Sequence, residues 1–299
     1  MTEAILNYYK KVKKYKDTTI KIYTKHLVHI FKEVLKVKQY KLEYLISEKE
    51  DILEFISGLD KTSSQKIYLN SILSILDDDD YHKMLKSVSL IHKRKRNYKK
   101  FTRKEMFKYR SLETLYNRIL NKEKNKSIDI ILASLYIIFP PLRGQDYYNL
   151  KYGISTKGNY YYKGSMVIRE FKTDKIYDKR VLKLPIIIKR MLEEYLIDRK
   201  QGNYVFLNRY NKKYNQSAFS KKITYLFEGI NINLLRKIYI SEVLHALKGS
   251  YKNIKLRKKL AIIMGHSLQT QEFTYKINNN IHYSSKNFMD YVLRVLNNI

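Results

Sequence analysis

The chain has 299 residues and a formal net charge of +32, because 60 Lys and Arg outnumber 28 Asp and Glu. Such an excess indicates a polyanionic partner, most often nucleic acid, although an AT-rich genome also raises Lys, Asn, Ile and Tyr. The absence of Cys excludes a disulfide framework and Cys-ligated zinc. The sequence has no apolar signal core and no run near the roughly 18 apolar residues of a membrane span, so we expect an intracellular protein that is neither secreted nor membrane-bound.

The first 92 residues predict a helical domain. Residues 18–31 place their apolar side chains on one helical face, and residues 48–59 and 63–76 are further helix candidates. The acidic run at 77–80 is typical of a solvated loop or helix cap rather than of a metal site. We therefore assign residues 1–92 to one domain built from helices.

The densest basic stretch of the chain follows and includes Lys93, Arg94, Lys95 and Arg96. It shows no apolar period, so we assign residues 93–102 to an interdomain linker. We interpret these four side chains as contacts to DNA phosphates. A solvated linker and a localisation signal are the alternatives.

Residues 103–299 predict a second domain, mostly helical with one β insertion. Only nine Gly and three Pro occur in the whole chain, which favours long helices. The strand candidates are 159–164, 166–171 and 177–184. The helix candidates are 128–142, 186–199, 217–228, 235–248, 254–264 and 285–297. The predicted fold class is mainly α with a small β-sheet: a helical domain, then an α+β domain that ends in a C-terminal helix.

Five polar residues in the second domain form an ordered pattern: Arg143, Lys172, Arg236, His266 and Tyr275. The His follows a Gly, and the Tyr comes nine residues after the His. Each motif alone is weak, because a single Arg or Tyr is most often a packing or surface residue. The five in this order, on a very basic chain, resemble the tyrosine recombinase (phage integrase) family.

The chemistry of that family explains why these residue types are needed. Opening a phosphodiester without a metal requires fixed positive charge around the non-bridging oxygens, an acid for the leaving group and an aligned nucleophile. Arg suits the first task because its fork is planar and permanently charged. Lys suits the acid role because its pKa falls readily among other cations. Tyr suits the nucleophile role because its phosphoester preserves bond energy for a second transfer.

The resemblance implies a role for each position. Arg143 and Arg236 match the two Arg that clamp the phosphate, and Lys172 matches the general acid at a hairpin tip. His266 matches the residue that hydrogen-bonds the phosphate, and Tyr275 matches the nucleophile. Lys175 is the competing candidate for the acid, and Tyr283 is the competing nucleophile.

Two further positions belong to the pattern. Asp146 lies three residues after the first Arg, where the family usually has an acid that supports the site. Asn233 stands where the family pattern has His, three residues before Arg236. Asn forms hydrogen bonds but takes no proton near neutral pH, so a dedicated imidazole base is in doubt. The segment from Asn233 also looks similar to integrases of large DNA viruses and their satellites.

The resemblance implies an integrase that cleaves and rejoins DNA through a 3′-phosphotyrosine, without ATP, metal or cofactor. Its partner would be double-stranded DNA, on which it would form a homotetramer. Residues 1–92 would be the core-binding domain and residues 103–299 the catalytic domain. A type IB topoisomerase and a catalytically silent DNA-binding protein of the same fold are the alternatives. The amphipathic segment 288–296 packs on a neighbouring protomer in relatives, and packing on its own domain is equally open.

Overall fold

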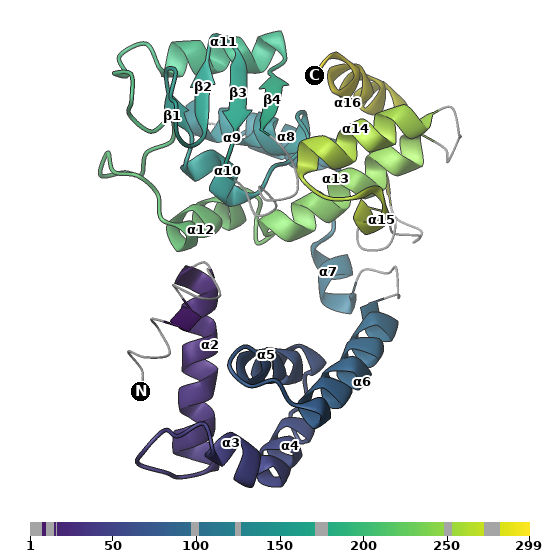
Figure 1. Cartoon of the computed structure of the whole chain (residues 1–299). Coiled ribbons are helices and arrows are strands. Elements are labelled where there is room, and N and C mark those ends of the chain that lie inside the picture. Colours follow the sequence, from purple (N-terminus) through teal and green to yellow (C-terminus); the bar gives the residue numbers. More distant parts are fainter. Residues whose placement is uncertain are drawn as a thin grey trace. The chain divides into compact units, whose positions relative to one another are not determined.

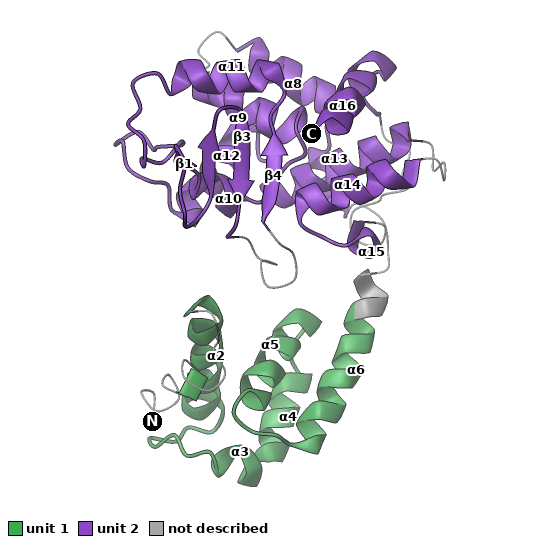
Figure 2. Ribbon diagram, turned by 45° about the horizontal axis from the view of Figure 1, so that its top comes forward, with its two compact units in different colours: residues 1–98 green, residues 99–299 purple. Residues whose placement is uncertain are grey.

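The computed structural model divides the chain into two compact units, residues 1–98 and 99–299 (Figure 2). Both are described below by themselves. The residues that the structure describes are 8–9, 15, 17–96, 102–122, 127–170, 179–247, 253–271 and 282–299, with backbone alone at 93–96 and 269. They form a mainly helical chain with one small sheet, which confirms the predicted fold class. Within these ranges, no helix has both the length and the apolar character needed to cross a membrane.

The described residues of the first unit form helices joined by loops. Its elements are α2 (Asp17–His29), the π-helix η1 (Ile30–Val34), α3 (Tyr44–Ser47), α4 (Lys49–Ser57), α5 (Thr62–Leu73) and α6 (Asp79–Arg96). Helix α5 packs against α2, α4 and α6 and so lies at the centre of the unit (Figure 1). The core is made of aliphatic and aromatic side chains, whose removal from water drives the packing.

Helix α6 begins at the acidic run and ends in the basic stretch. The side chain of Asp78 accepts hydrogen bonds from the backbone N–H groups of Asp80 and Tyr81, so the run caps the helix. The helix continues to Arg96, and residues 93–96, which we assigned to the linker, are therefore helical. Lys and Arg favour helix even where no apolar period marks one.

The second unit contains ten described helices and one sheet. The helices are α7 (Arg103–Lys108), α8 (Leu112–Leu120), α9 (Ser127–Ile137), α10 (Gly144–Tyr148), α11 (Ile186–Tyr195), α12 (Gln216–Leu226), α13 (Ile232–Ala246), α14 (Ile254–Met264), α15 (Leu268–Thr270) and α16 (Lys286–Asn298). The strands are β1 (Lys151–Tyr152), β2 (Tyr160–Tyr162), β3 (Ser165–Ile168) and β4 (Arg180–Lys183).

The strands follow one another in the order β1-β2-β3-β4 (Figure 1). The pair β1–β2 is parallel and the other two pairs are antiparallel. Along β4 the side chains of Arg180 and Leu182 are buried, whereas those of Val181 and Lys183 are exposed. A strand alternates its side chains between two faces, so β4 directs an arginine into the interior of the unit.

Helix α9 forms the centre of the second core. Its residues from Ile131 to Ile137 are all buried, and it packs against α8, α11, α12 and α13. The helix ends shortly before Pro140, because the ring of a proline clashes with helical geometry at the residue that precedes it. Helices α13, α14 and α16 lie side by side (Figure 1), so the C-terminal helix packs on its own unit.

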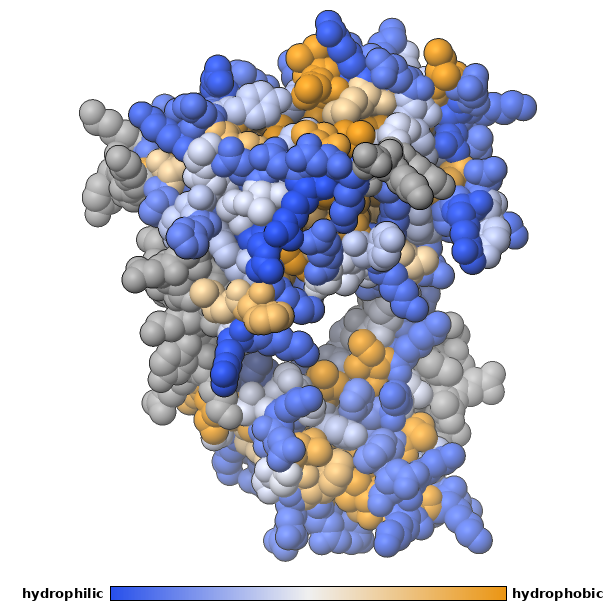
Figure 3. Space-filling view, turned by 180° about the vertical axis from the view of Figure 1, so that it is seen from behind, coloured by the Kyte–Doolittle hydropathy of each residue, from blue (hydrophilic) through white to orange (hydrophobic). Residues whose placement is uncertain are grey.

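The surface of each unit is dominated by polar and charged side chains. Figure 3 shows hydrophilic residues over most of the face drawn there, with apolar residues in small separate patches. The large exposed apolar side chains come from many different elements. Scattered apolar residues of this kind are normal, and the basic surface between them suits a polyanionic partner.

Candidate active site

The C-terminus of α14 is the point at which the candidate site is organised. Gly265 ends the helix in the left-handed region, with φ of 66°. Its N–H donates to the carbonyl of Ile262, and the N–H of His266 donates to that of Ala261, at 3.0 Å each. This turn is the usual way in which a glycine closes a helix. It leaves the carbonyl groups of residues 263–265 to other donors.

Three arginines from distant parts of the chain donate to these three carbonyls. The pairs and their N–O distances are Arg180 with Ile263 at 2.5 Å, Arg236 with Met264 at 2.9 Å, and Arg143 with Gly265 at 3.1 Å. The last carbonyls of a helix carry partial negative charge, which favours cations. The end of α14 therefore gathers three permanently charged guanidinium groups.

Each arginine comes from a different element. Arg143 is the N-cap of α10, Arg180 is the first residue of β4, and Arg236 lies in α13, whose N-cap Asn231 accepts from a backbone N–H of its first turn. Arg236 is 1% exposed, and its second terminal nitrogen donates to the carbonyl of Pro141 at 2.5 Å. Arg236 therefore ties the segment before α10 to the end of α14.

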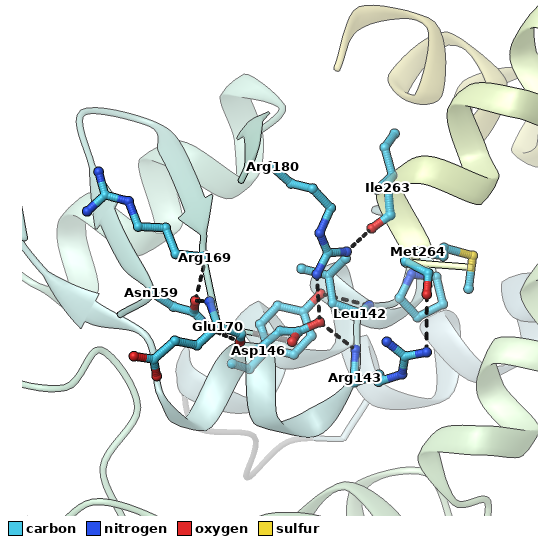
Figure 4. A network of polar contacts seen from close by, with 12 residues as sticks. Leu142, Arg143, Asp146, Asn159, Arg169, Glu170, Arg180, Ile263 and Met264 are labelled. Atoms are coloured by element: carbon cyan, nitrogen blue, oxygen red, sulfur yellow. Dashed lines mark hydrogen bonds and ion pairs between the residues drawn. The ribbon is translucent and has the colours of Figure 1, made fainter. Parts of the chain in front are cut away.

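Asp146 connects two of the arginines. It is 1% exposed, and its Oδ2 accepts from the backbone N–H of Arg143 at 3.2 Å and from Nη2 of Arg180 at 3.4 Å (Figure 4). Burial raises the pKa of the Asp146 carboxyl, and the charge of Arg180 opposes that shift. Burial likewise lowers the pKa of Arg180, which Asp146 opposes. Each group therefore reduces the cost of burying the charge of the other.

His266 follows the glycine and is 6% exposed. Its Nδ1 lies 3.2 Å from the carbonyl oxygen of Ser267, so Nδ1 carries a hydrogen, because a carbonyl can only accept. Burial, and then the charges of Arg236, Arg143 and Arg180, lower the pKa of His266 to about 4. The imidazole is therefore neutral at pH 7 in the absence of an anion.

The absence of a side chain at Gly265 lets two guanidinium groups approach the helix end. A Cβ there would lie 3.2 Å from Nη1 of Arg180 and 3.3 Å from Nη1 of Arg143. Both separations are tighter than ordinary contact, and the positive φ adds strain for any other residue. The geometry therefore explains why the Gly-His motif has a glycine at position 265, which the sequence alone could not show.

The structure brings together four of the predicted residues: Arg143, Asp146, Arg236 and His266. Asn233 is exposed in the first turn of α13, three residues before Arg236, and no described residue forms a hydrogen bond with its side chain. Lys172, with its competitor Lys175, and Tyr275 lie outside the described residues. Their roles stay predictions, as do those of the side chains at 93–96.

Sequence reasoning missed Arg180. The signal was present in the alternation of β4, where Arg180 has the same parity as Leu182 and Leu184. An arginine on the buried face of a strand is unusual and indicates a partner inside the protein. The exposed Val181 obscured this pattern, because it made the opposite face look apolar.

Sequence reasoning also missed a second buried charge, Glu242 of α13. Its carboxylate accepts from the Leu112 N–H at 2.9 Å, the Tyr109 hydroxyl at 3.1 Å, and the Ser284 N–H at 3.2 Å and hydroxyl. Burial raises the pKa of Glu242, and these donors oppose the shift. Glu242 thereby fastens the segment before α16 to the start of α8.

The same segment contains Tyr283, the competing nucleophile. Its ring stacks on His245 with centroids 3.7 Å apart and planes 5° apart. Burial, and then the charge of Glu242, raise the pKa of Tyr283. A phenol in this environment forms phenolate less readily, so Tyr283 is suited to packing rather than to attack.

The geometry of the arginine cluster defines what it can do. Several guanidinium N–H groups and a neutral imidazole converge from separate elements, and the scaffold holds them in place before any ligand binds. Such an arrangement can bind an oxyanion and stabilise charge that develops on it. Phosphate is the anion that the planar fork of Arg fits best.

Comparisons with known proteins add a distant likeness. No protein-family model matches the sequence, and no curated protein matches it. A solved structure, the crystal structure of XerA recombinase, is similar with a TM-score of 0.42 and 17% sequence identity. The similarity covers 93% of this chain and 95% of that chain. At this TM-score it carries no functional argument, so the function has to be argued from the side chains of the site.

Proposed function

We propose that this chain is a DNA strand-cleaving and strand-rejoining enzyme of the tyrosine recombinase type, acting as an integrase. One observation carries the proposal: Arg143, Arg236 and His266, which lie in three separate motifs of the sequence pattern, meet at the end of α14. Three motifs spread over more than a hundred residues would have no reason to meet if they were chance matches. An anion-binding cluster on a chain of net charge +32 favours nucleic acid as its substrate.

The proposed reaction assigns one task to each residue. Arg143 and Arg236 bind the non-bridging oxygens of the scissile phosphate, and His266 hydrogen-bonds the same group. The phenol of Tyr275 loses its proton to water, to the phosphate or to a neighbouring group, and its oxygen attacks phosphorus. The bond to the 5′ oxygen breaks at the same time, and Lys172 gives that oxygen a proton. A 3′-phosphotyrosine and a free 5′ hydroxyl result. Attack by a 5′ hydroxyl on the phosphotyrosine reverses these steps and rejoins the strand.

The anchors on either side of the nucleophile support this assignment. Before it, Gln271 donates its backbone N–H to the carbonyl of Ser267, directly after the Gly-His turn. After it, Ser284 is held by Glu242, and Ser285 donates to the carboxylate of Glu113 at 2.7 Å and 2.9 Å. Both segments that flank Tyr275 in the sequence are thus fixed to the second unit, close in sequence to its catalytic motifs.

Binding, by contrast, is proposed to spread over the chain. Double-stranded DNA would be held by basic side chains, among them Lys93, Arg94, Lys95 and Arg96, and strand exchange would require a homotetramer on DNA. Two alternatives differ in measurable ways. A type IB topoisomerase would relax plasmids of unrelated sequence as a monomer, and a catalytically silent protein would bind DNA without forming any adduct.

Covalent trapping tests the proposal directly. A nicked suicide substrate, from which the cleaved end diffuses away, should accumulate a protein–DNA adduct, and mass spectrometry of the digested adduct should place the nucleotide on Tyr275. Tyr275→Phe should form no adduct yet keep its DNA affinity, because only one hydroxyl is removed. Tyr283→Phe is the matched control and should still form the adduct. An adduct in Tyr275→Phe, or none in the native chain on any substrate, would refute the proposal.

A further inference from the structure

Arg180 is a buried cation with no place in the reaction described above. It is 5% exposed and enters the interior from the first position of β4. Its Nη2 donates to Asp146 at 3.4 Å, and its Nη1 donates to the carbonyl of Ile263 at 2.5 Å (Figure 4). The side chain thus joins three elements, because Asp146 lies in α10 and Ile263 in α14.

The partner of Arg180, rather than the number of its contacts, distinguishes it from the proposed phosphate ligands. Arg236 also donates from both terminal nitrogens, but to two carbonyls, whereas Nη2 of Arg180 donates to the buried carboxylate of Asp146. Arg143, in contrast, is only partly buried, and its guanidinium group donates to Gly265 at the edge of the cluster. An arginine stays charged when buried, so Arg180 keeps a counter-charge beside Asp146 at all ordinary pH values.

We propose that Arg180 is a positioning residue that sets the spacing between the start of α10, which carries Arg143, and the end of α14, where Arg236 and His266 lie. The inference rests on the proposed function. On one side it holds Asp146, whose carboxylate accepts from the backbone of Arg143. On the other side it holds the carbonyl of Ile263, next to the carbonyls that receive Arg236 and Arg143. One rigid fork therefore fixes the start of α10 against the end of α14.

The shape of the guanidinium group explains why an arginine is needed. Its planar fork directs two N–H groups at two acceptors at once, whereas an ammonium group on a flexible stem is a point charge. Without the fork, Asp146 would remain buried and lose its charged partner, and only Arg143 and Arg236 would still hold the start of α10 to the end of α14. A misplacement of about 1 Å in a reactive site is enough to lower a rate by about 100-fold.

The test compares cleavage of two suicide substrates, one with a normal scissile phosphate and one with a methylphosphonate, which lacks one negative charge. Arg180→Met should cleave both about 100-fold more slowly, because misplacement affects both. Arg143→Ala should lose much less on the methylphosphonate, because its role is to neutralise the missing charge. Arg180→Lys should recover part of the rate. Lys183→Met, which replaces an exposed cation further along strand β4, is the matched control and should cleave normally.

Each result decides the inference. DNA affinity of Arg180→Met should equal that of Lys183→Met, since both remove one charge. Near-normal cleavage by Arg180→Met, or a rescue on the methylphosphonate as large as that of Arg143→Ala, would overturn the positioning role. If Arg180→Met fails to fold, Asp146→Asn, which keeps the side-chain volume, should show the same equal loss on both substrates.

A second readout separates this inference from the proposed function. Hydrogen exchange at the amides of Arg143 and His266 reports the start of α10 and the end of α14 without any DNA. Both amides should exchange faster in Arg180→Met than in Lys183→Met. If the native chain forms no adduct, the proposed function fails, and unchanged exchange would then refute the positioning role as well. Faster exchange would still support the role of Arg180 in setting the spacing between α10 and α14.

Discussion

The two units differ most in what they bury. Tyrosines apart, the described residues of the first unit include only two buried polar side chains, Ser71 and Ser74. Those of the second unit include ten, of which five are titratable: Asp146, Arg180, Arg236, Glu242 and His266. Burying a charge is costly, and well-packed apolar residues often serve stability equally well or better. The contrast therefore favours the second unit as the place of the proposed chemistry.

The charges of the first unit lie on its surface instead. Lys49 pairs with Asp78 and Asp80, and Lys83 pairs with Asp80. Asp80 and Lys83 are exposed, and Lys49 and Asp78 are partly buried. Surface pairs of this kind contribute little to folding stability. A surface rich in exposed cations is suited to binding a polyanion, which fits the proposal that the first unit contributes to DNA binding.

Within the second unit, helix α13 supplies buried charges of both signs. Arg236 lies at the C-terminal end of α14, where carbonyls point outward, and Glu242 lies at the first N–H groups of α8. Each charge therefore meets the helix end of opposite polarity. Arg236 stands among other cations that can share an anion, whereas the carboxylate of Glu242 is surrounded by internal donors. One cluster is suited to binding, and the other to holding the fold.

The largest effect on stability is expected at Glu242. Glu242→Ala removes the acceptor of the Leu112 N–H and of the Ser284 hydroxyl, whereas the Tyr109 hydroxyl can still donate to the carbonyl of His282. Loss of one member of a buried charged network costs about 3–5 kcal/mol. In thermal and urea unfolding of the full chain, the second unit should unfold at a lower temperature and at a lower urea concentration. Lys49→Met in the first unit is the comparison and should change unfolding little. Equal effects of the two substitutions would contradict the contrast between the units.

The next prediction concerns binding rather than folding. Replacement of Lys93, Arg94, Lys95 and Arg96 by Gln should reduce the slope of log affinity against log salt by up to about 0.9 for each phosphate that the chain no longer neutralises. The cleavage rate of saturated complexes should stay unchanged, because none of these residues belongs to the arginine cluster. Binding measured at several salt concentrations gives the slope. An unchanged slope would show that the stretch is merely solvated.

Much of the fold could be predicted from the sequence, because it depends on local patterns. Helix α14 occupies the residues 254–264 that the apolar period predicted, and α16 and α12 begin within one residue of their predicted starts. Helix α6 was missed because its second half is rich in Lys and Arg and shows no clear apolar period. Two-residue strands such as β1 depend on their sheet partner and leave almost no sequence signal.

The candidate site was predicted in part for the same reason. Arg143, Arg236 and His266 each sit in a short motif, so sequence order was enough to find them. Arg180 and Glu242 have partners 83 and 130 residues away, and only the alternation of β4 gives a local signal for Arg180. Such contacts are fixed by tertiary packing alone. The residues that orient the site were thus harder to predict than those proposed to react.

A comparable effect on stability should follow from His266 as the pH changes. Its pKa falls from 6.5 to about 4 on folding, mainly through burial. Between these pH values the unfolded chain binds a proton that the folded chain does not. The free energy of unfolding should therefore decrease as the pH falls from 6.5 towards 4, by roughly 3 kcal/mol in total, and His266 should add no further change below pH 4.

The measurement compares unfolding of the native chain with that of His266→Gln from pH 7.5 to 4. The difference between them should carry the His266 contribution, because Asp146 and Glu242 act in both. Their pKa values are raised by burial, so their contribution has the opposite sign and favours the folded state at low pH. A native chain that matches His266→Gln at every pH would contradict the buried neutral imidazole.

A smaller effect is expected at Gly265. Gly265→Ala should destabilise the second unit by about 1–2 kcal/mol, because a side chain at φ of 66° is strained. It should also lower cleavage, since the new methyl group crowds Arg180 and Arg143. Gly202→Ala is the matched control, because its φ is 88° and nothing lies within 4 Å of the added Cβ. Loss of cleavage in both variants would show that backbone strain alone is responsible, and the crowding argument would fail.

The smallest effect is expected at Asn233, the position where the sequence departs from the family pattern. Its side chain is exposed in the first turn of α13, so substitution should leave stability nearly unchanged. Asn233→Ala should slow cleavage about tenfold through loss of one hydrogen bond to the phosphate. Asn233→His should be tolerated, and only this variant should gain a dependence of rate on pH near the histidine reference of about 6.5.

In the native chain, the Tyr275 phenol would lose its proton to water, to the phosphate or to a neighbouring group. The positive charge of Arg143 and Arg236 would help, because it favours phenolate. Single-turnover cleavage across pH measures both effects. A loss in Asn233→Ala as complete as that expected for Tyr275→Phe would mean that Asn233 is indispensable, and that the second unit places a reacting group outside its buried cluster.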